Sequence, residues 1–318
     1  MSRIAGAGEE MRGQMAMPIL APLRAYTTLA EVEQLHPGTE LVHVCDFYVT
    51  GAERGARVPG GLRLGRILNV DHHAPTPEME REITSTMLAA EYLSAGAVAG
   101  PDTCVVIHHT DCDSVLSSAM LLGLVPPDPD LVHASLCADH TGAAHPVADL
   151  LQAIDEGRGG TRTREQYLAS IHALEVLRAG GEPNEAALIA LRRREERRAA
   201  AKSLVDSGRF DVDGDGLLAF AESDGSIDSA FFPALVRGVA VIMVAHRRND
   251  RRWTVKLRLG DARVPGLTLH ALRMAEWDPQ YGGRWNAGSN GRGGGTAVPP
   301  RDYADSLRAR LVELVRTS

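Results

Sequence analysis

The chain has 318 residues and a formal net charge of −7 at pH 7, with 44% of its residues hydrophobic and 24% charged. This length fits one large domain or, better, two domains that each bury a core, and the composition excludes a disordered chain and a strongly basic nucleic-acid binder. The four cysteines form no CxxC pair, so neither a disulfide framework nor a thiolate zinc site is predicted, and a reduced, cytoplasmic compartment is expected. Two glutamates interrupt the N-terminal segment and no run of 18 apolar residues occurs, so neither a signal peptide nor a membrane span is expected.

Residues 1–38 form a lead-in with one predicted helix, TTLAEVEQL at 27–35, which a threonine cap begins. Three apolar runs then each end in polar residues: ELVHVCDFY (40–48), RILNVDHHAP (66–75) and DTCVVIHHTDCDS (102–114). Helical patterns follow the second and third runs, which indicates βα units of a parallel sheet. A fourth run, DLVHASLCADHTG at 130–142, repeats the pattern and predicts a fourth strand.

Acidic residues stand at the end of each of these runs. They are Asp46, Asp71, Asp111 with Asp113, and Asp139. Ligand sites of open parallel sheets lie beyond the carboxyl ends of the strands, so these acids are expected in one crevice.

Histidines are concentrated in the same part of the chain, where nine of the twelve precede residue 146. Alternation of His109, Asp111 and Asp113 would place three side chains on one side of an extended segment that could hold a cation. Imidazole and carboxylate ligands without thiolate suit Mn²⁺ or another hard-to-borderline divalent ion. The number of such groups exceeds the needs of one ion, which predicts two metals with a shared carboxylate, the arrangement used for displacement at phosphorus.

The second half of the chain is predicted to contain a helical linker and another domain. Residues 151–207 have helical composition, and the charged run Arg192–Arg198 is interpreted as a solvated helix face. A smaller α/β domain is placed at 208–318. Its expected elements are strands within 217–223, 234–246 and 251–260, a short helix at 267–277, a glycine-rich loop at 282–295 and a final helix at 302–315.

One segment matches a calcium-binding pattern. Asp211, Asp213, Asp215 and Glu222, with Gly216, satisfy the EF-hand loop in full, which makes Ca²⁺ a candidate ligand. The next residues form a poor exit helix and only one copy is present. The favoured alternative is a turn that opens the strand at 217–223.

Three motifs resemble those of the DHH/DHHA1 phosphoesterase superfamily. Asp71-His72-His73 in NVDHHAP resembles its name-giving motif, and the segment from His109 to Ala119 resembles its HxDxDxxxSA motif. VKLRLG, with Arg258, stands where the DHHA1 domain has a strand with a substrate-facing arginine, and the segment 281–288 stands where it has a GGGHxxAAG-like loop. The order of the first two motifs is reversed, which implies a circularly permuted first domain, and Arg284 and Trp285 replace the loop's histidine.

The resemblance implies an α/β fold in which a parallel-sheet DHH-type domain at 1–150 precedes the DHHA1-like domain at 208–318. It implies metal ligands, with Asp46 as the expected bridge between two ions: Asp46, His72, His109, Asp111, Asp113 and Asp139. It implies catalytic roles for His73, which would face the substrate phosphate, and for Asp71, which would orient the pair. Substrate contacts would come from the second domain: Arg258, Gly283, Arg284 and Asn286.

The expected function is therefore hydrolysis of a small phosphate ester, short oligonucleotide or nucleoside bisphosphate between the two domains, with two divalent ions, Mn²⁺ first and Mg²⁺ or Co²⁺ as alternatives. Neither a long nucleic acid nor a membrane is expected as a partner, since a long single strand favours a basic groove; a homodimer is left open. Two alternatives stay open, an inorganic pyrophosphatase or specialised-metabolite phosphatase, and a non-catalytic metal or nucleotide sensor.

Overall fold

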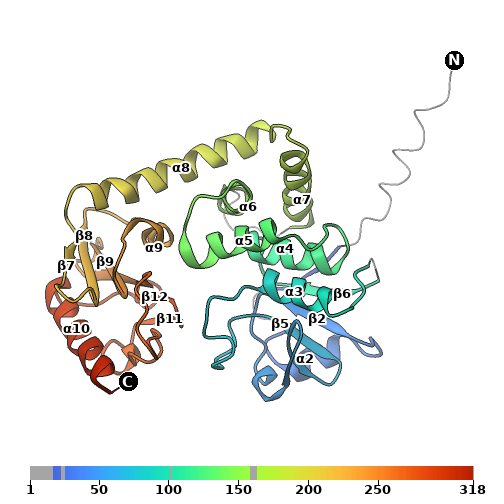
Figure 1. The fold of residues 1–318 in the computed structure, drawn as a ribbon, viewed down its shortest axis with the longest axis horizontal. Coiled ribbons are helices and arrows are strands. Elements are labelled where there is room, and N and C mark those ends of the chain that lie inside the picture. Colours follow the sequence, from blue (N-terminus) through green and yellow to red (C-terminus); the bar gives the residue numbers. More distant parts are fainter. Residues whose placement is uncertain (1–16, 23–25, 101, 158–162, 318) are drawn as a thin grey trace. The chain divides into compact units, whose positions relative to one another are not determined.

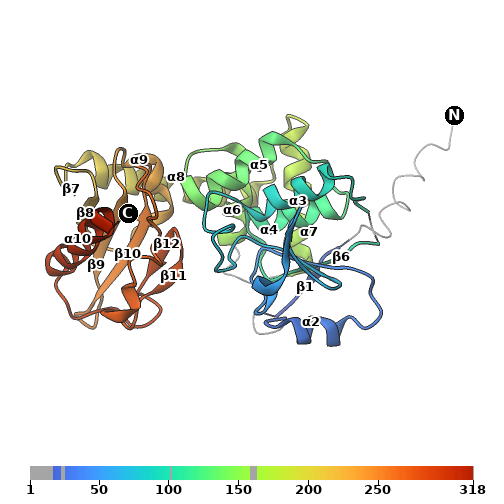
Figure 2. The same ribbon diagram turned by 60° about the horizontal axis from the view of Figure 1, so that its bottom comes forward.

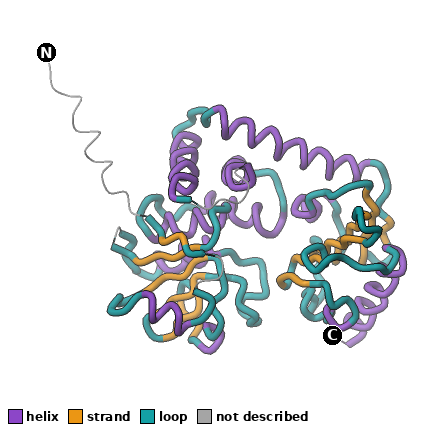
Figure 3. Tube along the Cα trace, turned by 180° about the vertical axis from the view of Figure 1, so that it is seen from behind, coloured by secondary structure: helices purple, strands orange, loops and turns teal. Residues whose placement is uncertain are grey.

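The computed structural model describes residues 17–22, 26–100, 102–157 and 163–317. The chain divides into two compact units, one of residues 1–135 with 150–184 and the other of residues 136–149 with 185–318. Each unit contains one six-stranded sheet in its described residues, and the strands are drawn in orange in Figure 3. Both units mix helices and strands, so the fold class is α/β, as predicted.

The sheet of the first unit has the strand order β1-β6-β2-β5-β4-β3. Its neighbours β1, β6, β2 and β5 run parallel, whereas β4 and β3 add an antiparallel hairpin. The strands are β1 (Ile19–Leu20), β2 (Val42–Cys45), β3 (Ala56–Val58), β4 (Gly61–Leu64), β5 (Ile67–Val70) and β6 (Cys104–Ile107). The predicted parallel sheet is thus present, extended by a hairpin that the sequence did not indicate.

Helices cover both faces of this sheet. Helix α2 (Leu29–Leu35) lies on one face, where its Val32 is fully buried in a core with Val42, Val44 and Ile67, and α3 (Ser85–Ser94) and α4 (Cys112–Leu121) lie on the other (Figures 1 and 2). The threonine cap predicted for α2 is Thr28, which forms a capping box with Glu31. Further helices of this part of the chain are α5 (Pro129–Leu136), α6 (Pro146–Gly157) and α7 (Arg164–Arg178).

The predicted fourth strand at 130–142 is wrong. This segment forms α5, followed by a π-helical turn at Cys137–Thr141. Its buried residues Leu131, Ala134 and Ser135 recur at intervals of three and four, the spacing of a helix face, and it contains only one β-branched residue before Thr141. Asp139 therefore lies in a helical turn and does not follow a strand.

The sheet of the second unit has the order β11-β12-β10-β9-β8-β7 and is antiparallel except for the pair β8–β9. Its strands are β7 (Asp211–Val212), β8 (Leu218–Ser223), β9 (Val241–Arg247), β10 (Trp253–Leu259), β11 (Gly282–Arg284) and β12 (Ala287–Ser289). Val255 and Leu257 of β10 are buried on one face with Tyr303, Leu307 and Leu311 of α10 (Pro300–Thr317). On the other face, α8 (Glu185–Asp206) and α9 (Phe232–Leu235) cover β8 and β9.

Two predictions for this unit need correction. The helix expected at 267–277 is a series of turns with a 3₁₀ turn at Met274–Glu276, and the glycine-rich segment expected as a loop contains the β11–β12 hairpin. In this hairpin, a Cβ on Gly283 would lie 2.3 Å from the carbonyl oxygen of Ala287, so glycine lets the two short strands approach each other. The division of the chain also differs from the expected one, because no separate linker unit exists and residues 151–207 are shared between the two units.

Candidate metal centre

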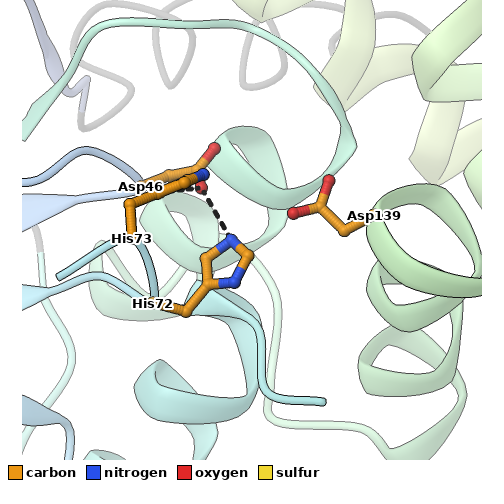
Figure 4. Close-up of side chains that lie close together, drawn as sticks. All are labelled: Asp46, His72, His73 and Asp139. Carbon is orange, nitrogen blue, oxygen red and sulfur yellow. Dashed lines mark ion pairs between the residues drawn. The ribbon is translucent and has the colours of Figure 1, made fainter. Parts of the chain in front are cut away.

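The candidate site of the first unit lies at the carboxyl ends of two adjacent parallel strands. Asp46 directly follows β2, and Asp71, His72 and His73 directly follow β5, its neighbour in the sheet. Asp46, His72 and His73 each offer a ligand atom, and these atoms lie within 4.8 Å of one another. Figure 4 shows their side chains turned toward one another, with the ion pair between Asp46 and His72 drawn dashed.

Asp46 is held in a conformation that few residues adopt. Its backbone has φ = 58°, in the left-handed region, where aspartate and asparagine are tolerated better than most side chains at a cost of about 1 kcal/mol. Its amide donates to the carbonyl of Val70 at 3.1 Å, and its carboxylate accepts hydrogen bonds from the hydroxyls of Ser114 at 2.5 Å and Ser85 at 3.3 Å. Strained backbone of this kind is frequent at functional sites, and here it aims a carboxylate that is only 4% exposed.

His72 is a fully enclosed ring between two carboxylates. The side chain is buried, and its Nε2 lies 3.7 Å from Asp46 Oδ1 and 3.7 Å from Asp113 Oδ2. Burying carboxylates beside imidazoles is costly unless hydrogen bonds or a further positive charge compensate for it. The arrangement therefore fits a bound cation.

His73 is oriented by Asp71. Its Nδ1 lies 2.5 Å from Asp71 Oδ1, and its backbone amide donates to Asp71 Oδ2 at 3.0 Å. A histidine that donates one ring N–H to a carboxylate keeps the lone pair of its other ring nitrogen, which is the usual state of metal-ligating histidines. Asp71 itself is 1% exposed, so its carboxylate stays fixed beneath the ring.

Asp113 does not lie on an extended strand with His109 and Asp111, as the alternation predicted. It belongs to the first turn of α4, and its carboxylate accepts from the amides of Ser85 and Thr86 at 2.7 and 2.8 Å and from the Thr86 hydroxyl at 2.6 Å. These donors form the N-terminus of α3, so Asp113 joins the two helices and neutralises the positive end of α3. Its oxygens are largely occupied, which leaves little capacity for a metal ion.

Asp111 and His109 also differ from the predicted arrangement. Asp111 is the N-cap of α4 and accepts from the amide of Ser114 at 3.1 Å. Within the described parts of the chain, neither residue belongs to the group whose ligand atoms lie within 4.8 Å of one another. His109 and Asp111 are thus outside the group that contains Asp46 and His72, whereas Asp113 approaches Nε2 of His72 to 3.7 Å.

The electrostatic environment of the site is strongly negative. Burial first, and then the carboxylates of Asp46, Asp113 and Asp71, raise the pKa of the Cys45 thiol well above its ordinary value. Three buried carboxylates close together repel one another, and a divalent cation relieves this repulsion. Donor chemistry, burial and charge of the first unit therefore all fit a divalent cation held by Asp46, His72 and His73.

Asp139, also drawn in Figure 4, belongs to the second unit and is described with that unit. Its Oδ2 lies 3.1 Å from Nη1 of Arg284, and the ring of the adjacent His140 lies 2.9 Å from the side-chain nitrogen of Asn286. The predicted substrate residues Arg284 and Asn286, on the β11–β12 hairpin, thus contact the segment that contains Asp139. Asp139 as a metal ligand stays a prediction.

Arg258, on β10, lies beside Arg284 across the sheet, since both pair with Ala287. Burial and then the charge of Arg284 lower the pKa of Arg258 to about 10. The carboxylates of Asp228 and Asp139 attract the Arg258 guanidinium and partly offset this shift of its pKa. An arginine in this state is suited to bind an anionic group.

The EF-hand pattern folds as the alternative predicted, as a hairpin turn. β7 begins at Asp211, and Asp213 accepts a hydrogen bond from the amide of Leu218, the first residue of β8, at 3.0 Å. Arg308 lies 3.4 Å from Asp213 and 3.8 Å from Asp215, and Glu222 is exposed on β8. Arg308 thus lies beside two of these carboxylates, and none of the four acids joins a cation-sized group in the described residues.

The sequence analysis missed the hydroxyls and amides that position the ligands. Ser85, Thr86 and Ser114 contact Asp46 or Asp113, and only the helix-start pattern Thr84-Ser85-Thr86 before an apolar run could have pointed to the α3 terminus.

None of the described helices combines the length and apolar composition needed to cross a membrane.

No protein-family model matches the sequence, and no curated protein is significantly similar to it. Among solved structures, the chain is similar to the pGpG-specific phosphodiesterase PggH from Vibrio cholerae, with 12% identity and a TM-score of 0.43 over 67% of this chain and 80% of PggH. It is also similar to exonuclease RecJ bound to manganese, with 14% identity and a TM-score of 0.36 over 91% of this chain and 78% of RecJ. RecJ from Thermus thermophilus in complex with Mn²⁺ shows 16% identity and a TM-score of 0.35, with 92% of this chain and 44% of RecJ covered.

These similar structures are a phosphodiesterase and an exonuclease.

Proposed function

We propose that this protein is a metal-dependent phosphoesterase that hydrolyses a small phosphate ester or a short oligonucleotide. The observation that carries the proposal is the group of the buried Asp46 and His72 with the partly buried His73, whose ligand atoms lie within 4.8 Å of one another. The motifs that resemble those of the DHH/DHHA1 phosphoesterases agree with it.

In this proposal, Asp46, His72 and His73 hold a divalent cation, with Mn²⁺ as the first choice and Mg²⁺ or Co²⁺ as alternatives. A bound divalent ion would supply Lewis-acid polarisation of a phosphoryl oxygen and a lower pKa of bound water. Ligands for a second ion, with Asp46 shared between the two, would come from His109, Asp111, Asp113 and Asp139, as the motif resemblance implies. The occupied oxygens of Asp113 make it the weakest member of this set.

The remaining residues bind and orient. Asp71 keeps the Nδ1 proton of His73 in place, so that the ring presents its other nitrogen in one fixed direction. Arg258 and Arg284 of the second unit would bind a phosphate group of the substrate, helped by Asn286 and by the close strand approach at Gly283.

Hydrolysis of bis(p-nitrophenyl) phosphate by the purified protein tests this proposal. We expect release of p-nitrophenol with Mn²⁺, loss of activity in excess chelator, and only background activity for Asp46→Asn, since asparagine keeps the backbone conformation but removes the charge. An Asp128→Asn variant, which changes a surface ion pair with Arg178, is the matched control with wild-type activity. Full activity of Asp46→Asn would contradict the proposal, and turnover of pyrophosphate alone would favour the pyrophosphatase alternative.

A further inference from the structure

One face of the second sheet is cationic along β10 and β11. Directly paired residues of antiparallel strands share a face, so Arg284 of β11 and Arg258 of β10 lie in one row through Ala287. Lys256 lies on the same face two residues along β10, about 7 Å from Arg258, and His246 is paired with Thr254 one row further. On β8 and β9 this face is apolar and covered by α8 and α9, so its character changes at β10.

These cations lie within one another's electrostatic field. Burial lowers the pKa of Lys256. The carboxylate of Asp228 raises this pKa, and the charge of Arg258 lowers it further. Burial, Lys256 and Arg248 lower the pKa of His246. Repulsion along a row of like charges does not stabilise a fold, and such a row is typical of a surface that binds a chain of anions.

A cavity lies at the far end of this row. It has a volume of about 560 Å³ and is lined by His246, Arg248 and Ser226 among others. The two acids of its wall are each paired with an arginine, Asp224 with Arg209 at 3.0 Å and Asp250 with Arg248 at 3.4 Å. Space for a ligand group thus adjoins the cations.

The donors at this end are held in place before any ligand binds. Lys256 Nζ donates to the carbonyl of Ile227 at 2.6 Å and lies 3.2 Å from the Ser226 hydroxyl, and Arg248 donates from Nη1 to the carbonyl of Gly291 at 3.2 Å. An ammonium has three N–H donors and a guanidinium five, so each group keeps donors for an anion. Preorganised donors of this kind lower the entropic cost of binding.

We propose that Lys256, His246 and Arg248 form a distal anion subsite that binds the next phosphate of a short oligonucleotide whose first phosphate lies at Arg258 and Arg284. The inference deepens the proposed function and rests on it, because Arg258 and Arg284 are the phosphate residues of that proposal. It predicts a preference for substrates with at least two phosphates along an extended strand over mononucleotides.

Calorimetric titration of the full chain, in chelator so that no ligand is hydrolysed, tests the subsite with AMP, pApA and pApApA as probes. We expect wild-type affinity to rise about tenfold from AMP to the longer probes, the gain of one charge-assisted contact. Lys256→Gln should abolish this gain and leave AMP affinity unchanged, and Lys256→Arg should restore it. Lys202→Gln, which removes an exposed charge on α8, is the matched control and should behave as wild type.

Equal affinity gain in Lys256→Gln and wild type, or the absence of a gain in wild type, would overturn the distal subsite. Arg258→Gln separates this outcome from failure of the proposed function, since it should weaken all three probes alike. If Arg258→Gln bound AMP as tightly as wild type, the phosphate site of the proposed function would itself be wrong. Thermal unfolding of every variant checks that the second unit stays folded.

Discussion

At the scale of single residues, the pairing of Asp71 with His73 determines which ring nitrogen of the histidine is available to a metal ion. The 2.5 Å contact fixes the Nδ1 proton, and both groups follow the same strand, β5. Replacement of Asp71 by asparagine keeps the shape of the side chain but removes its charge. A carboxylate behind a ligating histidine therefore contributes to affinity without touching the ion.

We expect Asp71→Asn to weaken Mn²⁺ binding by about 10–100-fold, the usual cost of losing such a partner. Isothermal titration of the chelator-treated protein with Mn²⁺ measures this change. Asp128→Asn serves as the control, since its carboxylate lies at the surface beside Arg178. Unchanged Mn²⁺ affinity in Asp71→Asn would show that Asp71 does not orient a ligand.

Much of this residue-level arrangement could be predicted from the sequence. Asp46, His72 and His73 end adjacent apolar runs, and parallel pairing of those runs suffices to bring them together. The hydroxyls of Ser85 and Ser114 could not be predicted, because they reach Asp46 from helices whose packing depends on tertiary structure.

At the scale of elements, the N-terminus of α3 is stabilised by a carboxylate from α4. Asp113 is fully buried and accepts from two amides and one hydroxyl at this helix end. The buried carboxylate stabilises the fold only while these amide and hydroxyl donors contact it. The donors in turn would be left without an acceptor if the carboxylate were removed. Asp113 and Asp46 therefore differ in role although both are buried acids near His72.

We expect Asp113→Asn to lower the free energy of unfolding of the metal-free protein by about 2–3 kcal/mol, because an amide cannot accept from all three donors without placing an N–H against one of them. Asp46→Asn should leave this stability unchanged or raise it, since it removes one of three repelling carboxylates. Urea unfolding in chelator measures both. Equal stability of Asp113→Asn and wild type would contradict the structural role of Asp113.

Element boundaries were predictable where local pattern and tertiary structure agree. The strands at 218–223 and 253–259 and the final helix meet this condition. The segment 130–142 does not meet this condition, because its apolar residues fit a helix as well as a strand. In the folded protein it packs as a helix. The glycine-rich segment pairs as a hairpin because Asn290 fixes its end, donating to Asp278 and accepting from the amide of Val255.

At the scale of the whole molecule, stability should depend on pH through a buried histidine. His43 is 4% exposed on β2, and burial lowers its pKa from the ordinary 6.5 to about 4, with Arg63 adding to the shift. The folded state therefore keeps His43 neutral at a pH where the unfolded chain takes up a proton. Stability from this group is present above pH 6.5 and is lost as the pH falls toward 4.

We expect the free energy of unfolding to fall by up to about 3 kcal/mol from this residue between pH 7 and pH 4. The decline should be smaller by a similar amount in His43→Gln, which has no group that titrates in this range. Chemical denaturation of both proteins at several pH values measures the difference. Parallel pH profiles of the two proteins would mean that His43 is not the responsible group.

The division into two units was predictable only in outline. Composition suggested a first domain, helical residues and a second domain, but the segment 136–149 packs with residues of the second unit. Gly142 illustrates the reason, since a Cβ there would lie 1.8 Å from the carbonyl oxygen of Ala230, far away in the sequence. Contacts of this kind arise between distant segments and leave no local pattern.

The central claim is that Asp46, His72 and His73 hold a divalent cation, and Mn²⁺ binding followed by electron paramagnetic resonance tests it most directly. Free Mn²⁺ gives a strong signal that is lost on binding, so a titration reports stoichiometry and affinity without any substrate. The account predicts tight binding by wild type and Asp128→Asn, and affinity lower by about 100-fold or more in Asp46→Asn, which loses a charged ligand. Wild-type stoichiometry and affinity in Asp46→Asn, or no binding by wild type, would contradict it.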